Sequence, residues 1–147
     1  MDMPKVCFYP LRQGNIQESL VFACRLVDKA SQLGHRIHLL VRDEIQLNQL
    51  DELLWQFRTD SFIPHQRLSD DQEAIDTRVT LGTENRLPAE RDVLINLTET
   101  VWDQHQQFPD IREIVPATEE ERALGRQRYR VYQDHGYTVE TKKLPAN

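Results

Sequence analysis

Three arginines at helical spacing are the residues of this sequence best suited to binding a charged ligand. Arg122, Arg126 and Arg130 fall four residues apart, and Tyr129 follows Arg126 by three. At about 100° per residue, these four side chains share one helical face. The planar guanidinium fork can donate two parallel hydrogen bonds, which suits a carboxylate or a phosphate. The alternative is a solvated helix face whose arginines pair with neighbouring acids such as Glu119.

The residues around this stripe predict a helix from Glu119 to His135. Thr118 lies three residues before Glu121, the pattern of a capping box in which both side chains satisfy backbone N–H groups. Gly136 follows the last turn, where a positive φ ends a helix. The apolar residues expected on the face opposite the arginines are Leu124 and Val131.

The elements that would position this helix alternate between apolar strands and amphipathic helices. The predicted strands are Lys5–Tyr9, Arg36–Val41, Thr77–Leu81, Asp92–Leu97, Ile111–Val115 and Tyr137–Thr141. The predicted helices are Ile16–Leu33 and one beginning at Asp43 or Asp51. This order indicates a single α/β domain over residues 1–147. We expect a three-layer, Rossmann-like fold with a central, mostly parallel sheet flanked by helices.

The connections between these elements carry polar sequence. Residues 66–75 and 83–91 are predicted to be mobile loops, and residues 142–147 a frayed tail. Ser61–His65 is apolar but stopped by proline, which favours an edge segment. A capped helical turn is expected near Thr98 or Thr100.

Composition narrows the class of protein. The net charge is −6, with 39% apolar and 29% charged residues, which is typical of a soluble globular chain. Such an acidic balance argues against a general nucleic-acid binder. No apolar run approaches the roughly 20 residues of a membrane span. Cys7 and Cys24 lie in apolar sequence, which favours buried thiols in a reducing compartment, so a cytoplasmic location is expected.

Motifs for nucleotide, metal or covalent chemistry are absent from the sequence. The first strand–helix junction, Pro10–Gln17, holds one glycine, Gly14, and no Gly-Lys-Ser/Thr tripeptide occurs. The five histidines do not lie at zinc-ligand spacing. We therefore expect no catalytic residue, no metal and no cofactor, although a carboxylate pair involving Asp70 or Asp71 stays open.

Two aromatic residues stand at the ends of predicted elements. Trp55 closes an amphipathic stretch, and Phe62 precedes Pro64 beside a polar loop. Both could belong to the core. They are also residue types that anchor protein interfaces. Together with the arginine stripe, they favour a binding module over an enzyme.

The sequence resembles a known family, the chi subunit of the bacterial DNA polymerase III holoenzyme. The resemblance covers nearly the whole chain. It is carried by the blocks VCFY, LDELLWQFRTDSFIPH, RDVLINL, and IVP followed by ALGRQRYRVYQDHGY. It implies a non-catalytic accessory subunit that joins the psi subunit of the clamp loader to the acidic, phenylalanine-ending tail of single-stranded DNA-binding protein. DNA contact would be indirect, and a helicase partner stays open.

The resemblance also implies two sets of binding residues. The pocket for the tail of single-stranded DNA-binding protein would comprise Trp55, Val115, Arg122, Arg126, Tyr129 and Arg130. The contact with the psi subunit would comprise Phe62, Pro64 and His65. Arg126 is expected to anchor the terminal carboxylate. Arg122 and Arg130 replace lysines of the family and keep its positive charge.

Two other functions compete with this one. An α/β domain could be a nucleotide-binding enzyme, although the missing phosphate loop disfavours it. The arginine helix could also bind single-stranded DNA directly, although the net charge disfavours that.

Overall fold

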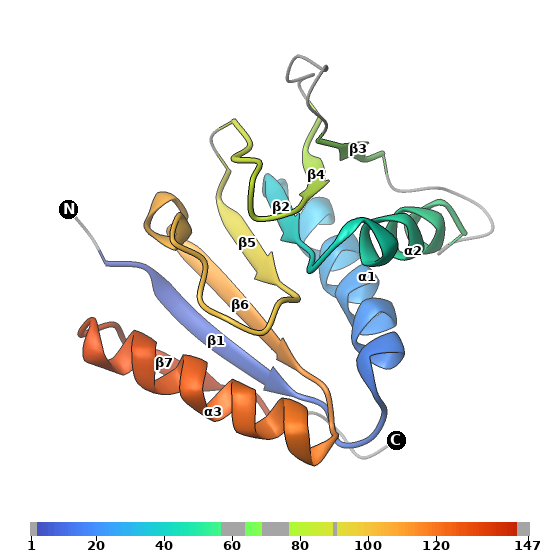
Figure 1. The fold of residues 1–147 in the computed structure, drawn as a ribbon. Helices are drawn as coiled ribbons and strands as arrows, with labels where there is room; N and C mark the ends of the chain where they lie inside the picture. The colour runs from blue at the N-terminus through green and yellow to red at the C-terminus, as the bar shows by residue number, and fades with distance from the viewer. Residues whose placement is uncertain (1–2, 57–63, 69–76, 90, 144–147) are drawn as a thin grey trace.

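A single parallel sheet organises the molecule (Figure 1). The computed structural model describes residues 3–56, 64–68, 77–89 and 91–143. Within these residues seven strands pair in the order β3-β4-β2-β5-β6-β1-β7, and every pair is parallel. The strands are β1 Lys5–Pro10, β2 Ile37–Leu40, β3 Gln66–Arg67, β4 Val79–Gly82, β5 Val93–Asn96, β6 Asp110–Val115 and β7 Val139–Thr141. The predicted α/β fold with a parallel sheet is confirmed.

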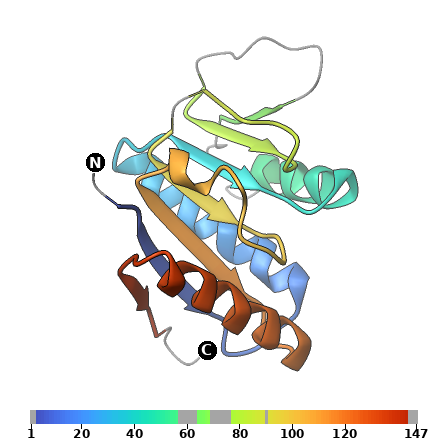
Figure 2. The same ribbon diagram turned by 60° about the vertical axis from the view of Figure 1, so that its left-hand side comes forward.

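Helices cover both faces of this sheet. They are α1 Ile16–Gln32, α2 Glu44–Gln56 and α3 Glu119–Asp134, and a 3-10 turn, η1, spans His105–Gln107. Helices α1 and α2 pack into one core cluster, whereas α3 contributes to a second cluster on the other face. Figure 2 shows α3 in front of the sheet and α1 behind it. This arrangement gives the three layers that the sequence predicts.

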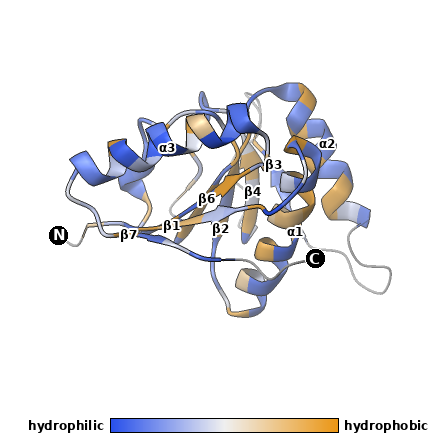
Figure 3. Ribbon diagram, turned by 90° about the horizontal axis from the view of Figure 1, so that it is seen from below, coloured by the Kyte–Doolittle hydropathy of each residue, from blue (hydrophilic) through white to orange (hydrophobic). Residues whose placement is uncertain are grey.

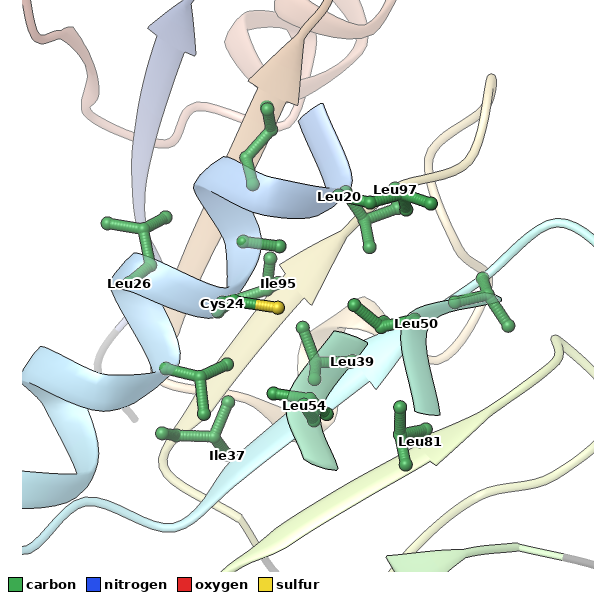
Figure 4. Close-up of a cluster of buried hydrophobic side chains, with 14 of the residues drawn as sticks. Leu20, Cys24, Leu26, Ile37, Leu39, Leu50, Leu54, Leu81, Ile95 and Leu97 are labelled. Carbon is green, nitrogen blue, oxygen red and sulfur yellow. The ribbon is translucent and has the colours of Figure 1, made fainter. Parts of the chain in front are cut away.

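The larger core lies between the sheet and helices α1 and α2. Its side chains alternate along the strands: Leu39 and Ile95 enter this core, whereas their neighbours Leu40 and Leu94 face α3. The close-up in Figure 4 shows Cys24 of α1 lying among Leu39 and Ile95 of the sheet and Leu50 of α2. Because both faces of the central strands are buried, their sequences are almost continuously apolar.

Side-chain caps set where the first two helices begin. The Asn15 side chain accepts a hydrogen bond from Gln17 N at 2.9 Å, and Glu18 returns to Asn15 N at 2.8 Å, which completes a capping box. Helix α2 follows Asp43, whose Oδ1 accepts from Gln46 N at 2.8 Å. Asp43, rather than Asp51, is therefore its start.

Several connections differ from the sequence prediction. Residues 66–75 are not wholly a loop, because Gln66 and Arg67 pair with Thr80 and Leu81 as strand β3. The polar side chains of this strand disguise it, since it lies at the sheet edge. No helical turn forms at Thr98 or Thr100 in the described chain; the one short turn comes later, at η1.

The remaining predicted connections are described only in part. Residues 83–89 are without helix or strand, as expected for a connection. Ser61–Ile63, residues 69–76 and residues 144–147 lie outside the described residues. None of the helices in the described part of the chain combines the length and hydrophobicity that a membrane crossing requires.

Candidate functional site

A groove of about 240 Å³ lies between α3 and the carboxyl ends of β1, β6 and β7. The carboxyl ends of parallel strands are the usual place for a ligand in such a fold. The groove is mostly apolar, with two guanidiniums and a phenol at its rim. Its lining residues are Phe8, Pro10, Val115, Arg122, Gly125, Arg126, Tyr129 and Thr141.

The structure brings together four of the residues predicted for the tail pocket: Val115, Arg122, Arg126 and Tyr129. Arg130 is exposed one helical turn beyond Arg126 and does not line the groove. The stripe of arginines therefore runs along the outer face of α3 and enters the groove through its first two members.

Within the part of the chain that the structure describes, no acidic side chain neutralises the charge of this stripe. Among the described residues, no carboxylate forms an ion pair with Arg122, Arg126 or Arg130. The alternative in which these arginines pair with acids such as Glu119 is therefore not what the structure shows. Three exposed guanidiniums in an acidic chain make this face a local attractant for anions.

Helix α3 packs on the sheet through a polar face. Leu124 and Val131, predicted opposite the arginines, do not form the packing face, because Val131 is exposed and Leu124 is half-buried. The buried residues of α3 are Glu121, Gly125, Arg128 and Tyr132. Polar side chains can occupy this buried face because Glu121, Arg128 and Tyr132 each form a hydrogen bond with another side chain. In Figure 3 most of α3 is coloured hydrophilic for the same reason.

A buried ion pair fixes α3 on β6. Arg128 Nε donates to Glu113 Oε1 at 2.8 Å, and both side chains are almost fully excluded from solvent. The other oxygen of Glu113 accepts from Tyr132 Oη and from Asn96 Nδ2. Burial raises the pKa of the Glu113 carboxyl, and the Arg128 guanidinium opposes that shift. The pair holds the helix so that its opposite face carries the arginine stripe.

A second contact fixes the start of α3. Thr118 Oγ1 accepts from Glu121 N at 3.3 Å, as predicted. The Glu121 side chain does not complete a capping box, because it accepts from Arg42 Nη2 at 2.5 Å. Arg42 follows β2, and its Nε also donates to Leu97 O at 3.0 Å. The first turn of α3 is thereby tied to the ends of two central strands.

Gly125 allows α3 to approach the sheet closely at the groove. A Cβ atom at this position would lie 3.0 and 3.1 Å from the two methyl carbons of Val115. Real Cβ contacts are rarely so short, so any larger residue would push the helix away from Val115. Gly125 therefore helps set the width of the groove.

Trp55 does not line the groove, so the structure does not bring it together with the other residues predicted for the tail pocket. It lies on α2, which packs on the face of the sheet opposite α3. Half of its surface is exposed, and its ring centroid lies 4.8 Å from that of His65. His65 Nε2 is in turn 2.8 Å from Asp51 Oδ1.

Of the residues predicted to contact the psi subunit, two are described. The His65 side chain is only 1% exposed and supports Trp55, whereas Pro64 is exposed beside them. Phe62 lies outside the described residues. Trp55 and Pro64 therefore share a surface on the α2 side, with the buried His65 behind it, whereas the arginine stripe lies on a helix that packs on the other face of the sheet.

Four groove residues were missed by sequence reasoning: Phe8, Pro10, Gly125 and Thr141. Two signals were available. Phe8 and Pro10 end the first strand, where parallel sheets bind ligands. Gly125 interrupts a helix, where glycine costs about 1 kcal/mol relative to alanine and usually has a packing reason.

At the junction between β1 and α1, the protein's own side chains take the position that a phosphate group would need. The backbone N–H groups that could bind a phosphate at the start of α1 meet the Asn15 side chain, and Glu18 brings negative charge to the same turn. This arrangement counts against the nucleotide-binding alternative.

Burial shifts the pKa of a few side chains away from the groove toward the neutral form. Burial raises the pKa of the Cys24 thiol to about 12 and also raises that of Cys7, which is only half-buried. His105 is buried, and its Nδ1 lies 2.7 Å from Trp102 O. No group of three metal-binding side chains occurs within the described ranges.

The fold and the groove define a parallel α/β protein with an apolar, guanidinium-rimmed groove at the carboxyl ends of its strands. A family model described as "DNA polymerase III chi subunit, HolC" matches residues 3–140. The chain belongs to this family, and it is accordingly an accessory subunit of DNA replication. The resemblance drawn from the sequence blocks is confirmed.

Similar proteins support the assignment. The chain is 35% identical to the DNA polymerase III subunit chi of Pseudomonas aeruginosa, over 97% of this chain and 99% of that protein. It is 28% identical to the subunit chi of Haemophilus influenzae, over 93% and 95% of the two chains. For the Escherichia coli subunit chi the identity is 27% over 80% of each chain.

A likeness to a solved structure concerns the fold alone. The crystal structure of T4 UvsW superposes with a TM-score of 0.63 at 8% identity. The match covers 97% of this chain and 42% of that chain, so the present protein spans less than half of its length.

Proposed function

We propose that this chi subunit joins the psi subunit of the clamp loader to the acidic C-terminal tail of single-stranded DNA-binding protein. The α3 groove would receive the tail. The observation that carries this proposal is an apolar groove whose rim bears Arg122 and Arg126 without a carboxylate partner among the described residues.

The chemistry of such a tail matches the groove. Its terminal carboxylate needs a bidentate donor, and Arg126 beside Tyr129 supplies one. Its aromatic ring needs an apolar socket, which Phe8 and Val115 supply. Arg122 and the exposed Arg130 add positive charge that attracts the preceding acidic residues.

The psi subunit would bind the α2 side of the molecule. Trp55 is a large, half-exposed aromatic residue held in place by His65, and Pro64 is exposed beside it. A rigid aromatic side chain of this kind is typical of an interface anchor. Trp55 therefore moves from the tail pocket to the psi contact in this proposal, and the two partners occupy opposite faces of the sheet.

A peptide titration tests the tail site. A fluorescently labelled peptide ending Asp-Asp-Ile-Pro-Phe is titrated with the protein, as the free acid and as the C-terminal amide. Arg126→Ala should weaken binding of the free acid about ten- to a hundredfold, the effect of losing a charge-assisted hydrogen bond. The amide should bind weakly to both proteins.

The control is Arg25→Ala, which removes an exposed arginine from α1 on the other face of the sheet. It should leave the affinity for the peptide unchanged. Absence of binding by the folded wild-type protein, or equal losses in the two variants, would contradict the proposed tail site.

A further inference from the structure

The backbone hydrogen bonding between β7 and β1 extends one residue past Thr141, along one side of the groove. Thr141 lies opposite Phe8 in the parallel register, and both residues line the groove. The next ladder bond is also present, because Lys142 N donates to Phe8 O at 2.9 Å. The chain is thus still bonded to β1 at Lys142, and an extension of the register by two residues would bring Lys143 to the level of Pro10, another groove residue.

The pleat of the strand assigns the two lysines to different faces. Val139 packs in the core cluster beneath α3, and Thr141 lines the groove on the same face. Because side chains two residues apart share a face in a strand, an extension of this alternation past Thr141 puts Lys143 on the groove side. Lys142 falls on the opposite side with Glu140, which lines a separate pocket together with Cys7. Both lysines are exposed.

The position of Lys143 places it at one particular end of the groove. Strand β7 runs parallel to β1, and β1 pairs through Pro10 with Val115 at the end of β6. Helix α3 begins shortly after β6, and Arg122 lies in its first turns. The carboxyl end of β7 and the amino-terminal half of α3 therefore meet at the same end of the groove.

We propose that Lys143 and Arg122 form a second cationic contact at this end of the groove, distinct from the carboxylate anchor at Arg126. Its ligands are the carboxylates of acidic side chains in the bound peptide, upstream of the terminal aromatic residue. This inference rests on the proposed tail site and extends it. Lys143 lies beyond residues 3–140, so the family match does not assign it a role.

The positive charge at this end of the groove favours acidic peptide side chains as its ligand. The groove end carries cations on both sides, and the described ion pairs include neither Lys143 nor Arg122. An exposed ammonium gains little from a single partner, but it adds to the field that already surrounds Arg122. The expected contribution is modest and sensitive to salt.

The test is a double-mutant cycle with two labelled peptides. One ends Asp-Asp-Ile-Pro-Phe, and the other carries asparagines in place of both aspartates. Each is titrated against wild type, Lys143→Gln and the matched control Lys142→Gln. Lys143→Gln should weaken the acidic peptide about two- to fourfold at low salt, as expected for an exposed charge pair, and leave the neutral peptide unchanged. Lys142→Gln should change neither affinity.

The outcomes separate this inference from the proposed function. Equal effects of the two lysine substitutions, or an equal effect of Lys143→Gln on both peptides, would overturn the role of Lys143 while leaving the tail site in place. Failure of the wild-type protein to bind either peptide would overturn the tail site, and the role of Lys143 with it.

Discussion

Arg128 and Glu113 form an ion pair 2.8 Å long that is almost entirely enclosed by protein. It joins the inner face of α3 to β6, while the outer face of the same helix carries three exposed arginines. One helix thus uses arginine for two purposes. The buried guanidinium positions the helix, and the exposed guanidiniums form no ion pair with the described residues.

Breaking the buried pair should destabilise the fold strongly. Glu113→Gln keeps the shape of the side chain but leaves the Arg128 charge buried without a counter-ion. The expected loss is about 3–5 kcal/mol of unfolding free energy, measured by urea denaturation. Asp110→Asn is the control, because Asp110 pairs with Arg112 in a partly exposed position. It should cost under about 1 kcal/mol, and similar losses for both variants would contradict this account.

The buried histidine should make the protein less stable in acid. Burial, reinforced by the nearby Arg91 charge, lowers the pKa of His38 from 6.5 to about 3. The unfolded chain therefore binds a proton that the folded chain does not, so this contribution is fully present above pH 6.5 and is lost as the pH falls toward 3. The slope from one such group approaches 1.4 kcal/mol per pH unit.

The measurement compares urea unfolding of wild type and His38→Gln between pH 7.5 and about pH 4.5. Other groups titrate in this range, including Glu113, whose raised pKa acts in the opposite direction. The comparison of the two proteins isolates the histidine. The wild type should lose more stability on acidification than the variant, and parallel pH profiles would contradict the assignment.

The close approach of α3 to Val115 gives a prediction for Gly125. Gly125→Ala gains about 1 kcal/mol of helix propensity but overpacks the contact at a cost of about 1–3 kcal/mol. We expect a net loss of about 1 kcal/mol together with weaker binding of the tail peptide, because the groove changes shape. Gln127→Ala, on the exposed side of the same helix, should change neither property. An unaltered peptide affinity in Gly125→Ala would show that the groove is not the binding site.

The two proposed surfaces should respond to substitution independently. Trp55→Ala should weaken binding of the psi subunit, measured by titration calorimetry, and leave the tail peptide unaffected. Arg126→Ala should do the reverse. Ile45→Ala is the control, since Ile45 is exposed near the other end of α2. A loss of tail binding in Trp55→Ala would restore the original prediction for that residue.

The sequence predicts the layered fold well because its central strands are buried on both faces. Runs such as Val93–Asn96 are then apolar throughout and easy to recognise. Strand β3 escapes recognition because it has two residues, both polar, at an edge. Its existence depends on pairing with β4, which no local pattern reveals.

Residue spacing by itself predicts the site only where one element carries it. Arg122, Arg126 and Tyr129 share a helix, so their spacing alone places them together. Trp55 was grouped with them by family resemblance, and the fold separates them because α2 and α3 pack on opposite faces. Arg128 was missed because its burial requires Glu113 on a different strand. Contacts between elements distant in sequence are what the spacing of residues cannot supply.

The most direct test of the central claim is an NMR titration of the ¹⁵N-labelled protein with the unlabelled free-acid peptide. The two tryptophans give separate indole signals. Trp55 is half-exposed on α2, whereas Trp102 is buried and its Nε1 donates a hydrogen bond to Glu84 O at 3.1 Å. We predict that the backbone signals of Val115, Gly125, Arg126 and Tyr129 shift on titration, whereas the Trp55 indole signal does not move. Shifts centred on Trp55 and α2, or none at the α3 groove, would contradict the assignment of the tail to this face.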